Sequence, residues 1–139
     1  MYITTEKVVL ASGSPRRRGY LRQFGIDFDV AVAEVDETPS SGEQPLHYAA
    51  RMAKLKNIAV QHSNPDRCII SADTIVFLDE TILGKPQSDV EAVQTLILLN
   101  GKVHCVATAL CISWQKKQLL HEEIVVTQVE FSSFTISTA

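Results

Sequence analysis

An apolar run near the start of the chain ends abruptly in a turn of small residues, and three arginines follow at once. Residues 7–11 have the short, β-branched composition of a buried strand. Ser14 and Pro15 are residue types that favour the N-cap and the first position of a helix. The sequence therefore predicts a strand that passes through a tight turn directly into a helix N-terminus.

Such a turn is a candidate anion-binding site. The first N–H groups of a helix are unpaired, and the helix dipole favours negative charge beside them. Arg16, Arg17 and Arg18 oppose this dipole, but their forked hydrogen bonds suit a phosphate group. We interpret the turn as a polyphosphate-binding site. Alternatively, it is a solvated basic helix start that Ser14 merely caps.

Composition limits the class of protein. The chain has 139 residues, which favours a single domain over 1–139, and 45% of them are hydrophobic, as in globular proteins. The net charge of −3 argues against a general nucleic-acid-binding surface. The apolar runs are too short to span a bilayer and the first residues lack a secretory signal, so we expect a cytoplasmic protein without a membrane partner. The cysteines lack metal spacing, and we expect reduced core residues at Cys68, Cys105 and Cys111.

The chain alternates between helix and strand patterns. Tyr20 and Phe24 recur at helical spacing in a helix that starts at Pro15 and closes at Gly25. The other predicted elements are strands at 28–32, 68–71 and 74–78, helices at 45–61 and 88–99, and an antiparallel hairpin of 103–114 and 119–131. The order β-α-β-α-β-β-α-β-β predicts an α/β domain with a mixed sheet.

The segment at 34–44 is an acidic loop, long for a compact domain, and a loop of this kind is often functional. It includes the stretch EVDET at 34–38. A cation such as Mg²⁺ needs only one or two carboxylates, because it keeps waters and takes phosphate oxygens as further ligands. One or two acids of this loop would suffice for that purpose. Alternatively, these acids are simply solvated.

Asp73 lies between two apolar runs, at the expected end of the strand formed by 68–71. Burying a carboxylate is costly unless it is paired or binds a metal ion. Asp73 could therefore act as a general base on a water molecule, or share a cation with Glu37. Alternatively, it is a turn aspartate that accepts hydrogen bonds from neighbouring N–H groups.

Two lysines complete the candidate set. Lys85 lies between Gly84 and Pro86, in a rigid turn that would hold its ammonium group in place. Lys56 lies on the helix predicted over 45–61. Each of them could also be an ordinary surface lysine. The four histidines have no metal-binding spacing, so we interpret them as structural or exposed.

Taken together and in this order, these motifs resemble those of the Maf family of nucleotide pyrophosphatases. The resemblance rests on the stretches LASGSPRRRGYLRQFGIDFDV, EVDETP, YAARMAKLKN, SADTIV, LGKP and EAVQTLILLNGKVHCVATAL. They cover nearly the whole chain up to about Phe131. The fold implied by the resemblance is an elongated mixed β-sheet flanked by helices, with a cleft between two lobes, as in the Maf and inosine-triphosphatase-like group.

The resemblance also implies an activity and a set of roles. The expected enzyme is cytoplasmic and hydrolyses nucleoside triphosphates to the monophosphate and pyrophosphate with a divalent cation, Mg²⁺ or Mn²⁺. Asp73 corresponds by position to the catalytic base, which would activate water for attack at the α-phosphorus, and Glu37 to the acid of the metal site. The expected phosphate-binding residues are Ser12, Ser14, Arg16, Arg17, Lys56 and Lys85.

Two branches of the family differ near the nucleotide base. One has an arginine after the Ser-Pro pair and a threonine after the aspartate, and resembles the dTTP/UTP branch. The other has a bulky aromatic residue and a glutamine, and prefers 7-methyl-GTP. The residues here are Arg16 and Thr74, which favour dTTP and UTP as substrates, and the resemblance implies that Thr74 also contacts the bound nucleotide.

The resemblance also points to a shorter chain. Members of the family continue through another helix and a glycine-rich segment that includes a base-selecting glutamine, whereas this sequence ends at Ala139. We expect a sheet edge exposed in this way to favour association, with a homodimer as the default. The alternative function is a truncated, inactive nucleotide-binding protein or a cell-division-linked interaction module.

Overall fold

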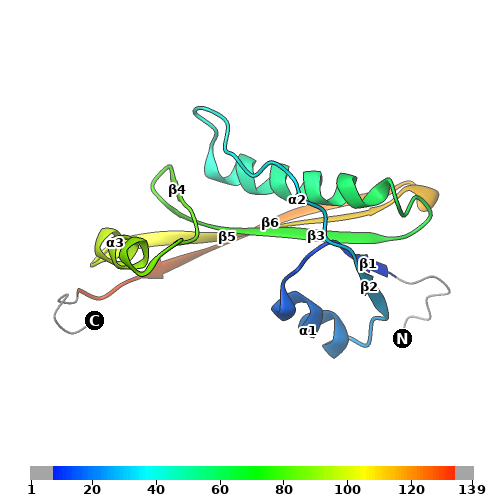
Figure 1. Ribbon diagram of the computed structural model, residues 1–139, viewed down its shortest axis with the longest axis horizontal. Coiled ribbons are helices and arrows are strands. Elements are labelled where there is room, and N and C mark those ends of the chain that lie inside the picture. The colour runs from blue at the N-terminus through cyan, green and yellow to red at the C-terminus, as the bar shows by residue number, and fades with distance from the viewer. Residues whose placement is uncertain (1–7, 134–139) are drawn as a thin grey trace.

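The computed structural model describes residues 8–133, and a long mixed sheet forms its centre (Figure 1). The elements are, in order, β1 (Val8–Leu10), α1 (Pro15–Gln23), β2 (Phe28–Val30), α2 (Pro45–Gln61), β3 (Ile69–Leu78), β4 (Thr81–Leu83), α3 (Asp89–Leu99), β5 (Val103–Trp114), a 3₁₀ turn (Gln115–Lys117) and β6 (Leu119–Glu130). This order confirms the predicted α/β fold. Lys7, predicted to begin the first strand, lies outside the described residues, and the predicted domain over 1–139 extends beyond them.

The sheet has the strand order β2-β1-β3-β5-β6, and β4 pairs with β3. The short strands β1, β2 and the start of β3 are parallel, whereas β3, β5 and β6 are long and antiparallel. Figure 1 shows α2 lying along one face of the long strands and α1 on the opposite side, beside β1 and β2. The predicted mixed sheet and the predicted hairpin of β5 and β6 are therefore confirmed.

The main core lies between α2 and the long strands. Met52 and Ala49 are fully buried on α2 and pack with Ile75 of β3 and Ala107 of β5. Small alanines let the helix approach the sheet closely, and burying Met52 contributes about 1.5–3 kcal/mol. Leu46, in the first turn of the same helix, is 39% exposed.

A buried polar cluster fixes the position of α2 on the sheet. Asn57 is fully buried, and its Nδ2 donates to the carbonyls of Ile69 on β3 and Cys111 on β5, at 3.1 Å each. Its Oδ1 accepts from the hydroxyl of Ser113. Since a buried amide without partners would be destabilising, this cluster favours one register of the helix, and Lys56 is thereby placed over β3.

The strand break predicted at residues 72 and 73 was wrong, and so were the core positions predicted for two of the three cysteines. β3 is one strand and does not break at residues 72 and 73, because it pairs residue by residue with β5 from Ile69 to Phe77. Asp73 therefore lies inside a strand, opposite Ala109. Of the three cysteines only Cys111 is buried, while the other two are half-buried at the ends of β3 and β5.

The apolar spacing predicted for α1 does not make a buried face. Tyr20 is 53% exposed, Phe24 is 79% exposed, and no residue of α1 is buried. The ends of the helix are nevertheless as predicted, because Ser14 Oγ accepts from the Arg17 N–H and Gly25 has a φ of 70°. Among residues 8–133, no helix combines the length and apolar character needed to cross a bilayer.

Candidate active site

The site lies where the sheet has a gap along one edge of β3. β1 pairs with β3 only at Ile69 and Ile70, and β4 pairs with it from Val76 onwards. The part of β3 between these pairings has no neighbour on that edge among the described strands. Side chains from both faces of the sheet can therefore reach the same space, at the carboxyl end of the parallel strand β1.

A hollow of about 750 Å³ occupies this position. It is lined by the turn after β1, the segment after β2, part of α2 and the turn after β4. Its volume falls within the usual range for ligand sites. Of the residues predicted from the sequence, those that line it are Ser12, Ser14, Arg17, Glu37, Lys56 and Lys85. Three separate segments, namely α1, α2 and the turn after β4, thus bring three cations to one concave surface.

The turn after β1 holds Arg17 in a defined position. Ser12 is buried, and its hydroxyl accepts from the Ser14 N–H and from Arg17 Nη1, at 3.2 Å each. Arg17 Nη2 donates to Thr74 Oγ1 at 2.8 Å. Burial lowers the pKa of Arg17, and the nearby Arg16 acts in the same direction while Asp73 opposes it. A partly desolvated guanidinium that borders a hollow is suited to binding an anion.

The other two arginines of the run lie differently. Arg16 is exposed and is not among the residues that line the hollow. Arg18 Nη2 donates to the Gly13 carbonyl at 3.2 Å, so this side chain contacts the backbone of the turn. Of the three consecutive arginines, only Arg17 therefore faces the hollow. The role predicted for Arg16 stays a prediction.

Lys56 lies between the two predicted acids. Its Nζ is 2.8 Å from Asp73 Oδ1 and 3.3 Å from Glu37 Oε1. Burial alone would lower the pKa of Lys56, but the hydrogen bond and charge of Asp73, with a contribution from Glu37, raise it. The ammonium group therefore remains charged and joins a buried carboxylate on β3 to an exposed one on the loop.

Thr108 is a residue of this region that sequence reasoning missed. It lies on β5 directly opposite Thr74, and the two hydroxyl oxygens are 3.0 Å apart. Thr74 Oγ1 accepts from Arg17, so its own proton is free to be donated to Thr108. Thr74, predicted to contact the nucleotide, does not line the hollow and instead supports Arg17 from behind. No signal in the sequence identifies Thr108, because strand register is a long-range property.

The acids present fit one type of metal site. Glu37 and Asp73 are the two carboxylates around Lys56, and the described residues contain no group of three or more acidic, histidine or cysteine side chains suited to a metal. Two carboxylates do not make an all-protein cage. They do fit Mg²⁺ or Mn²⁺, which retain waters and bind phosphate oxygens of a ligand.

The fold is shared with proteins of known structure. The Ham1 protein of Staphylococcus aureus has a TM-score of 0.62 at 16% sequence identity, over 90% of this chain and 71% of that protein. A HAM1 protein from Coxiella burnetii has a TM-score of 0.63 at 14% identity, over 89% and 72% of the two chains. At such low identity these likenesses show the fold alone, which is the elongated mixed sheet with flanking helices.

Sequence comparison gives the family. Residues 7–138 match the family described as "Maf-like protein", so the chain belongs to the Maf-like protein family, as its motifs predicted. It is 42% identical over 134 residues to a "dTTP/UTP pyrophosphatase" of Desulfotalea psychrophila, covering 96% of this chain and 69% of that relative. A protein of the same name from Aquifex aeolicus is 43% identical over 118 residues, 85% of this chain and 62% of the relative. The chain thus spans about two thirds of the length of these relatives.

Proposed function

We propose that this protein hydrolyses nucleoside triphosphates, dTTP and UTP above all, to the nucleoside monophosphate and pyrophosphate. The observation that carries the proposal is the meeting of Arg17, Lys56 and Lys85 on one hollow. Glu37 also lines this hollow, whereas the buried Asp73 does not line it and is connected to it through Lys56. The names of the relatives support the choice of reaction and substrate. Nucleotides are cytoplasmic metabolites, so we also propose that the protein acts in the cytoplasm.

The cations have the chemistry to bind and orient the triphosphate. Arg17 offers a planar fork of N–H donors, whereas Lys56 and Lys85 offer compact charges from other sides of the hollow. Ser12 and Ser14 hydroxyls lie in the same turn as Arg17 and can add neutral hydrogen bonds. Phosphoryl transfer depends mainly on such positioning and on neutralising charge, which these residues supply.

Asp73 is the proposed general base. One of its oxygens accepts from Lys56, which leaves the other able to accept a proton from water. The water oxygen forms a bond to the α-phosphorus, the bond from that phosphorus to the bridging oxygen breaks, and pyrophosphate leaves. Lys56 holds the Asp73 carboxylate in place, because its ammonium group donates a hydrogen bond to Asp73 Oδ1 at 2.8 Å.

Glu37 and Asp73 are the residues that would hold Mg²⁺ or Mn²⁺ together with phosphate oxygens. When bound, such an ion neutralises negative charge that develops on the phosphates. Arg16 and Thr74 are the proposed determinants of the base preference. For Thr74 this role would act through Arg17, which it contacts directly.

The test is a comparison of nucleotides for pyrophosphate release, with Asp73→Asn as the matched variant. We expect dTTP and UTP to be hydrolysed faster than 7-methyl-GTP. In Asp73→Asn, kcat should fall by about 10²–10⁴-fold while nucleotide binding and the circular dichroism spectrum persist. An unchanged rate in this variant would refute the role of Asp73. Nucleotide binding by the unaltered protein without any turnover would favour the alternative of an inactive nucleotide-binding module.

We propose that the chain forms a homodimer. β6 supports this, because its apolar residues Ile124 (41%), Val125 (63%) and Val126 (45%) are exposed on the outer strand of the sheet. Analytical ultracentrifugation decides the question, and a monomer at all concentrations would contradict it.

A further inference from the structure

We propose that the ion pair of Glu43 and Arg51 is a positioning clasp, which fixes the acidic loop at 34–44 so that Glu37 faces Lys56. The inference deepens the proposed function, because it assigns a role to two residues outside the hollow. Neither residue lines that hollow. Glu43 and Arg51 are connected to the hollow through the loop backbone, which contains no helix or strand between residues 31 and 44.

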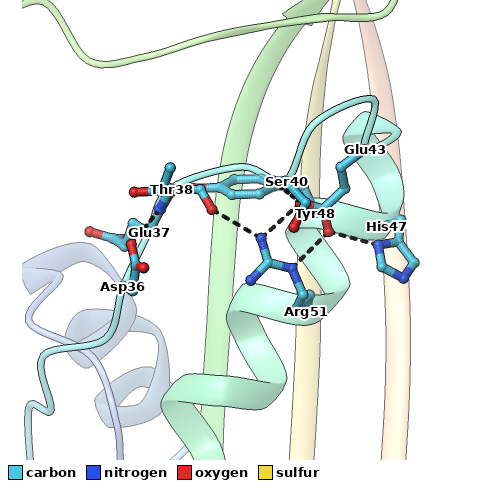
Figure 2. A network of polar contacts seen from close by, with 8 residues as sticks. All are labelled: Asp36, Glu37, Thr38, Ser40, Glu43, His47, Tyr48 and Arg51. Carbon is cyan, nitrogen blue, oxygen red and sulfur yellow. Dashed lines mark hydrogen bonds and ion pairs between the residues drawn. The ribbon is translucent and has the colours of Figure 1, made fainter.

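The clasp has the geometry of a strong, two-pronged ion pair (Figure 2). Arg51 Nε and Nη2 each lie 2.7 Å from a different oxygen of Glu43. The Glu43 side chain is only 4% exposed, while that of Arg51 is 29% exposed. Pairs with this forked geometry and partial exclusion of water are among the stronger ion pairs in proteins.

The same two side chains also bind the loop backbone between Glu37 and the turn at residues 41 and 42. Arg51 Nη2 donates to the Thr38 carbonyl at 3.2 Å, and Glu43 Oε1 accepts from the Ser40 N–H at 3.0 Å. Figure 2 shows that the segment carrying Thr38 and Ser40 folds back over Arg51. Arg51 of α2 therefore holds the loop at Glu43 and at Thr38, the residue that follows Glu37.

Tyr48 extends this connection to Glu37 itself. The Tyr48 hydroxyl donates to the Glu37 carbonyl at 2.6 Å, and the Arg51 guanidinium lies 5.6 Å from the centre of the Tyr48 ring. Tyr48 is 7% exposed, so its ring is held by the core. Because Tyr48, Arg51 and Lys56 all belong to α2, one rigid helix sets the distance between Glu37 and Lys56.

Glu37 needs such support because its own side chain is 61% exposed. The side-chain contact that the structure shows for it is the one with Lys56, at 3.3 Å. A carboxylate on an unsupported loop would sample many positions. The hydrogen bond of Arg51 lowers the pKa of Glu43 to about 2, with the Ser40 N–H contributing, so the clasp stays ionised at neutral pH.

The experiment compares Arg51→Ala and Glu43→Gln with Arg67→Ala, a matched control. Arg67 Nη2 lies 2.9 Å from Asp29 Oδ2 in a more exposed ion pair, and neither residue lines the hollow. In the nucleotide-free protein, hydrogen exchange of the amides at 35–41 should rise by about tenfold in both clasp variants and remain unchanged in the control. With dTTP and saturating Mg²⁺, kcat should fall by about tenfold while KM changes by less than about twofold.

Tyr48→Phe removes only the hydroxyl contact with Glu37 and should give an intermediate loss of kcat. If Arg51→Ala does not fold, Glu43→Gln and Tyr48→Phe decide the matter. Unchanged exchange at 35–41, or raised exchange with unchanged kcat, would overturn the positioning role. If the unaltered protein hydrolyses no nucleotide, the proposed function fails. In that case, hydrogen exchange together with Mn²⁺ binding in the presence of a non-hydrolysable dTTP analogue still tests the clasp, which predicts weaker binding in both clasp variants.

Discussion

The two helices that reach the hollow are built in opposite ways. α2 has a buried face that packs on β3 and β5, and Lys56 belongs to this well-packed helix. α1 has no buried residue, and it supplies Arg17 through hydrogen bonds to the hydroxyls of Ser12 and Thr74. Half of the site is thus fixed by the hydrophobic core, and the other half is fixed mainly by polar contacts.

The difference follows from the sheet. On the alternating pattern of β3, Asp73 shares the face that α2 covers, whereas Thr74 belongs to the opposite face, where α1 lies. Consecutive residues therefore serve different halves of the site. Asp73 and Lys56 lie on the face of the sheet where α2 forms the hydrophobic core. Arg17 lies on the opposite face, where a bound phosphate would add order.

The largest contrast should appear in stability. Met52→Ala on α2 should lower the free energy of unfolding by about 2–5 kcal/mol, because it leaves a cavity in a fully buried position. Leu21→Ala on α1 should lower it by less than about 1 kcal/mol, because no residue of α1 is buried. Urea titrations of both variants measure this difference. Equal losses would show that α1 is packed as firmly as α2.

A smaller contrast should appear in catalysis. Arg17→Lys keeps the charge but loses the fork that contacts Ser12 and Thr74, so kcat/KM for dTTP should fall by about tenfold. Thr108→Val removes only the support of Thr74 and should lower kcat/KM by about two- to threefold. Thermal unfolding should change little in Arg17→Lys. A kcat/KM equal to that of the unaltered protein would mean that Arg17 does not bind the substrate.

The smallest effect concerns pH and the clasp on α2. The pKa of Glu43 is lowered from 4.5 to about 2 by the hydrogen bond of Arg51, with further contributions from the Ser40 N–H and from His47. A lowered pKa means that this stabilisation is present above about pH 4.5 and is lost as the pH falls toward 2. The stability difference between the unaltered protein and Glu43→Gln should therefore shrink on acidification over this range. A difference that stays constant from pH 6 to pH 2.5 would show that the ionised Glu43 carboxylate does not stabilise the fold through Arg51.

Short-range sequence motifs correctly predicted the ends of α1, the helix that carries Arg17. Ser14 and Pro15 start α1 and Gly25 ends it, because caps depend on residues close in sequence. The break predicted in β3 at Asp73 was wrong, since pairing with β5 outweighs the low strand preference of aspartate. The predicted site residues stay predictions as regards their roles.

Other parts of the site depend on long-range geometry. Which of three consecutive arginines faces the hollow depends on the phase of α1 and on the position of Thr74, 57 residues later. Thr108 and Glu43 gave no signal, because their importance comes from strand register and from the folding of the loop onto α2. The candidate residues could be identified from their types in the sequence. The folded structure was needed to show which of them lie close together.

The most direct test of the proposed triphosphate site is a crystal structure of the protein with Mg²⁺ and α,β-imido-dTTP, a non-hydrolysable analogue. We expect the triphosphate in the hollow, within hydrogen-bond distance of Arg17, Lys56 and Lys85, with the α-phosphate on the side of Asp73. A nucleotide bound elsewhere on the molecule, with these side chains making no contact to phosphate, would contradict it.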